Sequence, residues 1–228
     1  MDKAELEAQA RTLGFDFLGV ACAGEFSTVP DWARTVIALG MVVLDRASDL
    51  ELYIEEQGEQ RWSKWAYERL VAGAARLALG LIDAGRRAQP LTYEDSSSLL
   101  DLRSAAVRAG LGVWGLNGLV LTRRFGPRVR FGAVFTDLDL TPDSPRQDYF
   151  CTSCSLCIAA CPTGALGPAG LDRSHCIAEF KPDAAMVRLQ RERLEFPTPH
   201  TRYQCARCIT ACPIGKGVPT RFWGLDPR

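Results

Sequence analysis

Eight of the nine cysteines lie after residue 150, in two groups of similar spacing. The first group is Cys151-x2-Cys154-x2-Cys157-x3-Cys161-Pro162, and the second is Cys205-x2-Cys208-x3-Cys212-Pro213. The first is the bacterial spacing in which three thiolates on a tight loop bind one 4Fe–4S cluster and a fourth serves another cluster. A zinc site would use cysteine pairs instead. The spacing therefore predicts iron–sulfur clusters.

The second group lacks one ligand, because Arg202 stands where the first group has Cys151. Cys176 is the one other cysteine nearby, and with it each cluster has four thiolates. The predicted ligand sets are Cys151, Cys154, Cys157 and Cys212 for cluster 1, and Cys161, Cys176, Cys205 and Cys208 for cluster 2. Each set takes one ligand from the other motif, which predicts a pair of clusters that transfers electrons. The ninth cysteine, Cys22, lies in an apolar strand-like run and is predicted to be structural.

Charge and hydropathy narrow the class of protein. The chain is 47% hydrophobic, which is typical of a globular protein. Its 27 basic and 27 acidic residues give no net charge, which argues against binding to nucleic acid through overall electrostatic attraction. No apolar run is long enough to span a membrane, and the first residues lack the apolar core of a secretion signal. We therefore expect a cytoplasmic protein without a membrane partner, in which clustered cysteines are ligands rather than disulfides.

The residues before the cysteines predict an α/β (α+β) domain over 1–146, joined by the polar stretch 142–146 to a cluster domain over 147–228. Asp2 is expected to cap a first helix that ends at Gly14. Further helices are expected over 61–86 and, capped by Asp95 or Ser96, up to Gly110. Strands are expected over 15–23, 35–44 and 91–93, followed by a hairpin of 119–122 with 130–136.

Nucleotide-binding and hydrolytic motifs are absent from the sequence. Gly110-Leu111-Gly112 follows a helix rather than a strand, so it is not a dinucleotide fingerprint. Both histidines, His175 and His200, lie among the cluster ligands, which leaves no serine–histidine–aspartate set.

The stretch "RAGLGVWGLNGLVLTRRFGPRVRFGAVFTDLDL", residues 108–140, resembles the segment before the clusters in epoxyqueuosine reductases and reductive dehalogenases. The opening "LGFDFLGVA" and the lone Cys176 in "RSHCIAEF" are also similar. The resemblance implies a nitroreductase-like first domain and a bacterial ferredoxin-like second domain. It further implies a cobalamin between them, with no protein histidine on the cobalt.

The glycine-rich loop would let backbone approach a flat macrocycle closely. The residues expected to contact the cobalamin are Gly110, Leu111, Gly112, Trp114, Gly115 and Asn117. A packing role for Trp114 stays open, and a flavin is the alternative cofactor. Leu116 departs from the family, whose members carry arginine or lysine there.

The resemblance also indicates two candidate proton donors. Tyr67 matches a tyrosine of the dehalogenases, and Asp95 is similar to an aspartate of the epoxyqueuosine reductases, displaced by one residue. The plainer interpretations are a core tyrosine and a helix cap.

These observations predict an iron–sulfur oxidoreductase that passes electrons from two 4Fe–4S clusters to cobalamin and reduces an unknown small molecule. The alternative is an electron-transfer protein that reductively activates the corrinoid of a partner protein. The expected electron donor is a low-potential protein of ferredoxin or flavodoxin type. The resemblance also implies that a C-terminal helical repeat region helps the epoxyqueuosine reductases to hold tRNA. Because this chain stops at Arg228, soon after the second cysteine group, tRNA is not expected as a partner.

Overall fold

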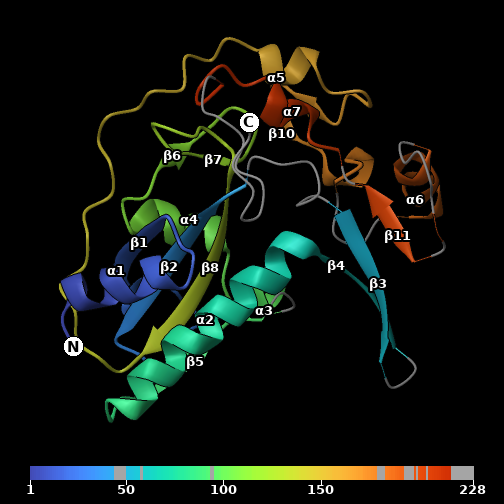
Figure 1. Ribbon diagram of the computed structural model, residues 1–228. Helices are drawn as coiled ribbons and strands as arrows, with labels where there is room; N and C mark the ends of the chain where they lie inside the picture. The colour runs from blue at the N-terminus through green and yellow to red at the C-terminus, as the bar shows by residue number, and fades with distance from the viewer. Residues whose placement is uncertain are drawn as a thin grey trace, which may run out of the picture.

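The computed structural model describes residues 1–43, 50–56, 59–92, 95–178, 183–192, 198, 200–203 and 205–216. It is a mixed α/β structure with the cysteine-rich segments at one end (Figure 1). Within these residues, no helix combines the length and hydropathy needed to cross a membrane.

The central element is a four-stranded antiparallel sheet of order β1-β2-β8-β5. Its strands are β1 (Phe17–Cys22), β2 (Thr35–Val42), β8 (Val129–Thr136) and β5 (Ala88–Pro90). In β2 and β8 nearly every residue is buried, because helices cover both faces of the sheet. The strands expected over 15–23 and 35–44 are confirmed.

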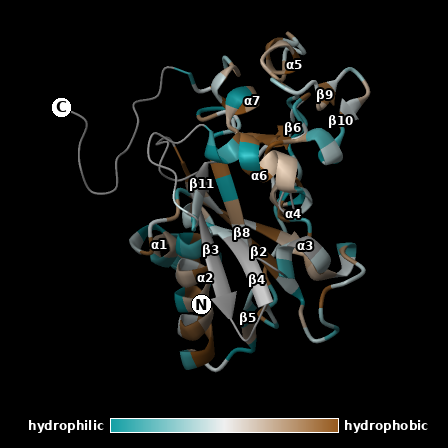
Figure 2. Cartoon of the chain, turned by 90° about the vertical axis from the view of Figure 1, so that its right-hand side faces the viewer, coloured by the Kyte–Doolittle hydropathy of each residue, from teal (hydrophilic) through white to brown (hydrophobic). Residues whose placement is uncertain are grey.

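Helices pack on opposite faces of this sheet. One core cluster joins Ile37, Leu39 and Val134 to α1 (Lys3–Thr12) and α2 (Trp65–Asp83). The other joins alternate sheet residues such as Ala38 and Phe135 to α4 (Leu102–Arg108). Along α2, hydrophobic and hydrophilic bands alternate in Figure 2, as in an amphipathic helix. The first part of the chain is therefore a helix–sheet–helix sandwich.

Local capping signals were predicted well in one helix and wrongly in another. Asp2 caps α1 as expected, and the structure shows that it does so in a capping box with Glu5. The helix expected between Asp95 and Gly110 is instead divided into α3 (Asp95–Ser98) and α4, and Asp101 caps the second piece. Gly110 ends α4 with φ +68°, as expected.

The helix expected over 61–86 starts later, at Trp65. Residues before it form β4 (Glu59–Lys64), which pairs with β3 (Leu50–Glu56). Neither strand was expected from the sequence, because β4 is stabilised by pairing with β3 and the apolar face of the helix begins only at Ala66. The strand expected over 91–93 lies earlier, as β5, and Tyr93 is outside the described residues.

The expected hairpin of 119–122 with 130–136 is wrong. Instead, β7 (Val120–Leu121) pairs with β6 (Val113–Trp114), while β8 lies between β2 and β5. Both segments had the right composition for strands, but the partner of each strand is chosen by packing against distant residues.

The cysteine-rich part is bound to the sandwich by backbone pairing. Strand β11 (Thr201–Tyr203) is antiparallel to β3 in a three-stranded sheet of order β11-β3-β4. The other elements of the cysteine-rich part are short; they are α5 (Leu156–Ala159), β9 (Leu166–Gly167), β10 (Gly170–Leu171), the 3-10 turn η3 (Arg173–His175), α6 (Ala184–Arg191) and α7 (Arg207–Thr210). The domain boundary at 146 stays a prediction, and strand pairing crosses it.

Two glycines hold the second cysteine loop against the sandwich. Gly126 has φ +57°, and a Cβ there would overlap the carbonyl oxygen of Ile214. Gly215 has φ +76°, and a Cβ there would overlap the backbone of Phe125. The two backbones therefore touch where side chains would keep them apart.

We expect Gly126→Ala to destabilise the protein more than Gly85→Ala. Gly85 shares the positive φ, at +76°, but a Cβ there would meet nothing within 4 Å. Gly85→Ala should cost about 1 kcal/mol from backbone strain, and Gly126→Ala about 2 kcal/mol more from overlap. Urea unfolding of both variants measures the difference, and equal losses would contradict the close contact.

Candidate iron–sulfur centre and adjoining cavity

The first cysteine motif is a tight loop leading into α5. Ser153 and Ser155 adopt left-handed backbone conformations, with φ 51° and 59°. These turns fold the chain back on itself, so that the cysteines on either side approach one another. Such a loop suits a cluster in which each iron takes one sulfur.

The structure brings the four cysteines of predicted set 1 together. Burial raises the pKa of Cys157, and the nearby thiols of Cys154 and Cys151 raise it further. Burial likewise raises the pKa of Cys212, which also lies close enough to Cys151 and Cys154 to interact with their charges. Thiolates gathered in this way repel one another, and iron would remove that repulsion.

Cys151 receives hydrogen bonds from the glycine-rich loop. Burial opposes ionisation of Cys151, but backbone amides of Leu116 and Ser153 donate to its sulfur, and the balance lowers the pKa of the thiol. Leu116 is the position at which the resemblance implies a basic residue, and here its backbone amide donates to the sulfur of a predicted cluster ligand. Amide donors of this kind stabilise thiolates and tune cluster potentials.

Arg128 clamps the end of the second cysteine motif. Its guanidinium donates to the carbonyl oxygens of Ile214 at 2.7 Å, Cys212 at 3.2 Å and Thr210 at 3.5 Å. These carbonyls belong to the last residue of the short helix α7 and to the turn after it, and carbonyls at a helix C-terminus lack intrahelical donors. Sequence analysis missed Arg128, and the only available signal was an arginine close to a glycine turn.

The cysteines of predicted set 2 share a cavity of about 470 Å³. All four line it, namely Cys161, Cys176, Cys205 and Cys208. None of the cysteines of set 1 is among the lining residues that the structure describes. The two predicted sets therefore differ in surroundings as well as in sequence.

Cys208 of set 2 is half-buried and has a strongly shifted pKa. Burial, with help from the charges of Cys205 and Cys176, raises its pKa to about 12. Cys157 of set 1 also acts on it electrostatically, so the two sets are neighbours. At Cys161, burial is outweighed by donors that include the Leu166 amide, 3.4 Å from the sulfur, and the thiol pKa is lowered.

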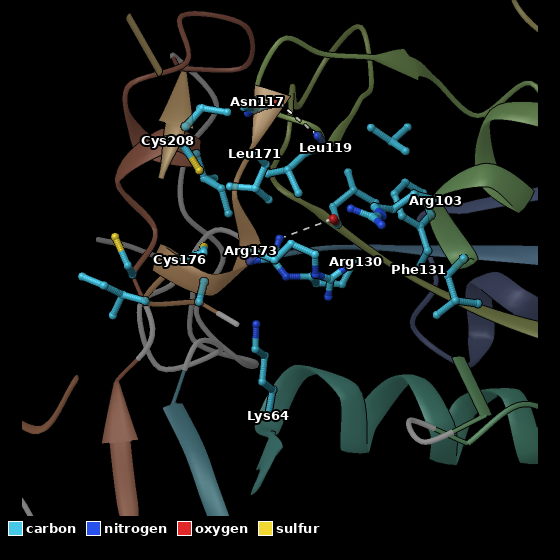
Figure 3. A pocket seen from close by; sticks show the side chains of 18 of the residues that line it. Lys64, Arg103, Asn117, Leu119, Arg130, Phe131, Leu171, Arg173, Cys176 and Cys208 are labelled. Carbon is cyan, nitrogen blue, oxygen red and sulfur yellow. Dashed lines mark hydrogen bonds between the residues drawn. The ribbon is translucent and has the colours of Figure 1, made fainter. Parts of the chain in front are cut away.

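The opposite wall of the cavity comes from the sandwich. Tyr67 near the start of α2, Asn117 in the glycine-rich loop and Phe131 in β8 line it, with leucines between them. Figure 3 shows Cys176 and Cys208 on one side of the cavity and Phe131 and Arg103 on the other. The volume lies in the range of ordinary ligand and cofactor sites.

The two predicted proton donors differ in position. Tyr67 is half-buried and lines the cavity, with the Lys64 ammonium 5.9 Å from its ring centre. Asp95 is not among the described lining residues; its carboxylate accepts from the Thr92 amide at 3.0 Å and its amide donates to the Thr92 hydroxyl. Asp95 therefore stabilises a turn, while its neighbours Ser96 and Ser98 line the cavity.

The glycine-rich loop lies mostly against protein. Of the six residues predicted to contact cobalamin, only Asn117 is among the described residues that line the cavity. A Cβ at Gly110 would lie 2.6 Å from the Ser144 carbonyl oxygen, and one at Gly112 would overlap Leu121. Trp114 is 37% exposed, with the Arg103 guanidinium 5.7 Å from its ring centre. Their contacts with cobalamin stay predictions.

In the described part of the chain, no three histidine, cysteine, aspartate or glutamate side chains converge closely enough to hold a single metal ion. A cubane cluster does not need such convergence, because its four sulfur ligands bind four separate irons.

Comparison with known proteins distinguishes an iron–sulfur domain from a site for a single metal ion. Residues 150–215 match the family model of a 4Fe-4S double cluster binding domain. The tetrachloroethene reductive dehalogenase of Desulfitobacterium hafniense is 33% identical over 71% of this chain and 29% of its own length. The epoxyqueuosine reductase of Lactococcus garvieae is 29% identical over 83% of this chain and 54% of its own length.

The chain is a homologue of the epoxyqueuosine reductases and the reductive dehalogenases. It carries their double 4Fe–4S domain, as the cysteine spacing predicted. These relatives are iron–sulfur reductases, and the chain spans about half the length of the one and less than a third of the other.

Solved structures support the same fold. An epoxyqueuosine reductase with an epoxyqueuosine-modified tRNA stem loop matches with a TM-score of 0.68 and 23% identity, over 94% of this chain and 65% of that one. A reductive dehalogenase that performs B12-dependent dehalogenation matches with a TM-score of 0.62 and 20% identity, over 93% and 32%. At these identities the match speaks for the fold alone.

The prediction that argued against tRNA as a partner is wrong. Epoxyqueuosine reductases are sequence relatives, and one of the matching structures holds a tRNA stem loop. The prediction rests on where the chain stops, and the end of a chain says nothing about which of its surfaces bind RNA. tRNA is therefore a candidate partner.

Arg128→Gln should loosen the second cysteine loop. It removes charge-assisted hydrogen bonds to three carbonyl oxygens, so we expect a loss of about 1–3 kcal/mol in the free energy of unfolding and faster release of iron. Arg34→Gln is the control, because Arg34 is 67% exposed and makes only a surface pair with Asp139 in the described chain. Iron release to a chelator at equal rates in the two variants would contradict the clamp.

Proposed function

We propose that the chain is a reductase in which two 4Fe–4S clusters pass electrons into the cavity, where a cobalamin takes part in reduction of a substrate. The observation that carries the proposal is that all four cysteines of set 2 and Tyr67 line one cavity. An electron carrier and a candidate proton donor thus face the same space. Reduction of a carbon centre needs both.

The proposed architecture has a nitroreductase-like domain over 1–146 and a ferredoxin-like domain over 147–228. The helix–sheet–helix sandwich supports the first assignment, and the family model over 150–215 supports the second. The cavity lies where they meet, a common position for a ligand site between domains.

The proposed cluster ligands are the two predicted sets. Because set 2 lines the cavity and set 1 does not, electrons would enter at cluster 1 and leave at cluster 2. The electrostatic contact of Cys157 with Cys208 supports a short step between them. Cys154 is exposed, so cluster 1 would lie within reach of a low-potential reductant.

The cavity suits a corrinoid without a protein imidazole ligand. His175 and His200 are not among its described lining residues, while leucines and Phe131 provide apolar wall. A cobalamin, when bound, supplies cobalt chemistry at very low potential, which cubane clusters are able to drive.

Side chains of the opposite wall would control protons and water. The Tyr67 hydroxyl would hold the proton that the substrate takes up, and the Lys64 ammonium lies 5.9 Å from the centre of its ring. The apolar walls would exclude water, which strengthens these interactions. Asp95 is the second candidate donor, and it would have to leave its contact with Thr92 to act.

The substrate class follows only from relatives. Epoxyqueuosine reductases act on modified tRNA and the dehalogenases on tetrachloroethene, so a tRNA nucleoside or an unrelated small molecule are the candidates. The chain covers only part of each relative, so neither substrate is transferred to it.

A specific observation favours a second function. Five of the six residues expected to contact cobalamin are not among the described residues that line the cavity, which suits a chain that delivers electrons to a corrinoid held by a partner protein. Gel filtration of the cluster-loaded chain with cobalamin separates the two functions. Retained corrinoid supports the reductase, and corrinoid that elutes alone supports the activator.

Cys176→Ala should remove one cluster and spare the other. We expect iron to fall from about eight to about four atoms per chain, because cluster 2 loses a ligand while set 1 is complete. Cys22→Ala is the matched control, since Cys22 lies in β1 far along the chain from both motifs, and should keep full iron. Iron analysis with electron paramagnetic resonance measures both; full iron in Cys176→Ala would refute its assignment as a ligand.

If the cavity holds cobalamin beside cluster 2, Cys176→Ala should still retain the corrinoid but reduce it at least about 100-fold more slowly. Tyr67→Phe should leave the corrinoid reduction rate unchanged, because it removes only a proton donor, and lower substrate turnover by about 100-fold or more. Stopped-flow absorbance follows the cobalt reduction directly. Equal cobalt reduction by wild type and Cys176→Ala would contradict the electron path.

A further inference from the structure

Cationic side chains crowd the cavity. Among its described lining residues are five cations and a single carboxylate; these are Lys64, Arg103, Arg130, Arg173 and Arg207, with Asp101 as the acid. Asp101 pairs with Arg103 at 3.0 Å. The remaining cations come from different elements on both walls. The described lining therefore carries more positive than negative charge, whereas the chain as a whole is neutral.

Three of these cations converge. Lys64 at the end of β4, Arg130 in β8 and Arg173 in η3 point toward one another from separate parts of the fold in Figure 3. Three cationic groups that face one space can donate to a single anion from several directions. Two guanidinium groups and an ammonium are also the donors that bind phosphate best, through paired and charge-assisted hydrogen bonds.

The position of Arg207 indicates a different role from that of the three converging cations. It is next to Cys208 in the sequence, where its charge would balance the negative charge of a thiolate-ligated cluster. Lys64 and Arg130 belong to the opposite wall of the cavity. Neither is next to a cysteine in the sequence, so the charge of a neighbouring cluster ligand does not account for their position. Arg130 nevertheless acts electrostatically on Cys208, so an anion held there would lie beside cluster 2.

We propose that Lys64, Arg130 and Arg173 form an anion site that binds a phosphate group of the ligand entering the cavity. The inference deepens the proposed function, since it names the substrate class as phosphate-bearing, but it does not require cobalamin. A phosphate fixed at this point would orient the rest of the ligand between Tyr67 and the cluster 2 cysteines.

Isothermal titration of the cluster-loaded chain with inorganic phosphate tests the site. Lys64→Gln and Arg130→Gln should each weaken phosphate binding by about tenfold, the effect of losing one charge-assisted hydrogen bond. Arg11→Gln is the control, because Arg11 is 66% exposed on α1 and should change the affinity less than twofold. Iron content and circular dichroism establish that each variant is folded.

Further titrations identify the source of the phosphate. Adenosine monophosphate tests a small phosphate ester, and a short RNA hairpin tests a nucleic-acid phosphodiester; the ligand whose binding drops in Lys64→Gln but not in Arg11→Gln is the one the site takes. Failure of the wild-type chain to bind phosphate, or equal binding by all variants, overturns the proposal. So does a result in which the two variants shift only the cluster reduction potential, since the cations would then serve the cluster.

The proposed function fails separately, through loss of cobalamin on gel filtration. Phosphate binding that depends on Lys64 and Arg130 would still stand in that case, because its probe is not a corrinoid.

Discussion

In the proposed ligand sets, Cys212 binds the same cluster as Cys151, Cys154 and Cys157, although it belongs to the second cysteine motif. In the proposed ligand sets this exchange joins the two cysteine segments, so that neither cluster forms without both. Closing such a long loop costs chain entropy, and the gathered thiolates repel one another. Even without iron, the protein reduces these costs through the hydrogen bonds of Arg128 and the backbone contact of Gly126 with Ile214.

The same constraint determines where chemistry is possible. Once the segments interlock, the cysteines of set 1 pack near the glycine-rich loop and those of set 2 face the cavity. Strand β11 then pairs with β3, which brings the neighbouring β4 and Lys64 to the side of the cavity opposite the cysteines. The site is thus built by parts of the chain that are distant in sequence. A cavity of this kind can combine electron supply, a phenol and anion-binding groups, which no single segment carries.

The glycine-rich loop shows how one composition serves more than one purpose. Glycines at 110 and 112 permit close approach, as expected, but the partners in the structure are the backbone at Ser144 and Leu121. The Leu116 amide supports the sulfur of Cys151, and Asn117 alone of the six reaches the cavity lining described. A family pattern can therefore mark a loop that is needed for the site without marking the residues that touch a ligand.

Local and periodic features could be predicted from the amino-acid sequence. The cysteine spacing indicated two clusters, Asp2 and Gly110 marked helix ends, and apolar runs marked β1 and β2, because each signal is contained in a few neighbouring residues. Strand partners could not be predicted, and so β3 and β4 were missed and β7 was paired wrongly with β8. The roles of Arg128, Lys64 and Arg130 could not be predicted either. A cationic residue in a sequence gives no indication of which carbonyl, thiol or second cation it will lie beside in the fold. Only folding places these charges next to the sulfur ligands, since the contacts join residues whose separation along the chain is many times their separation in space.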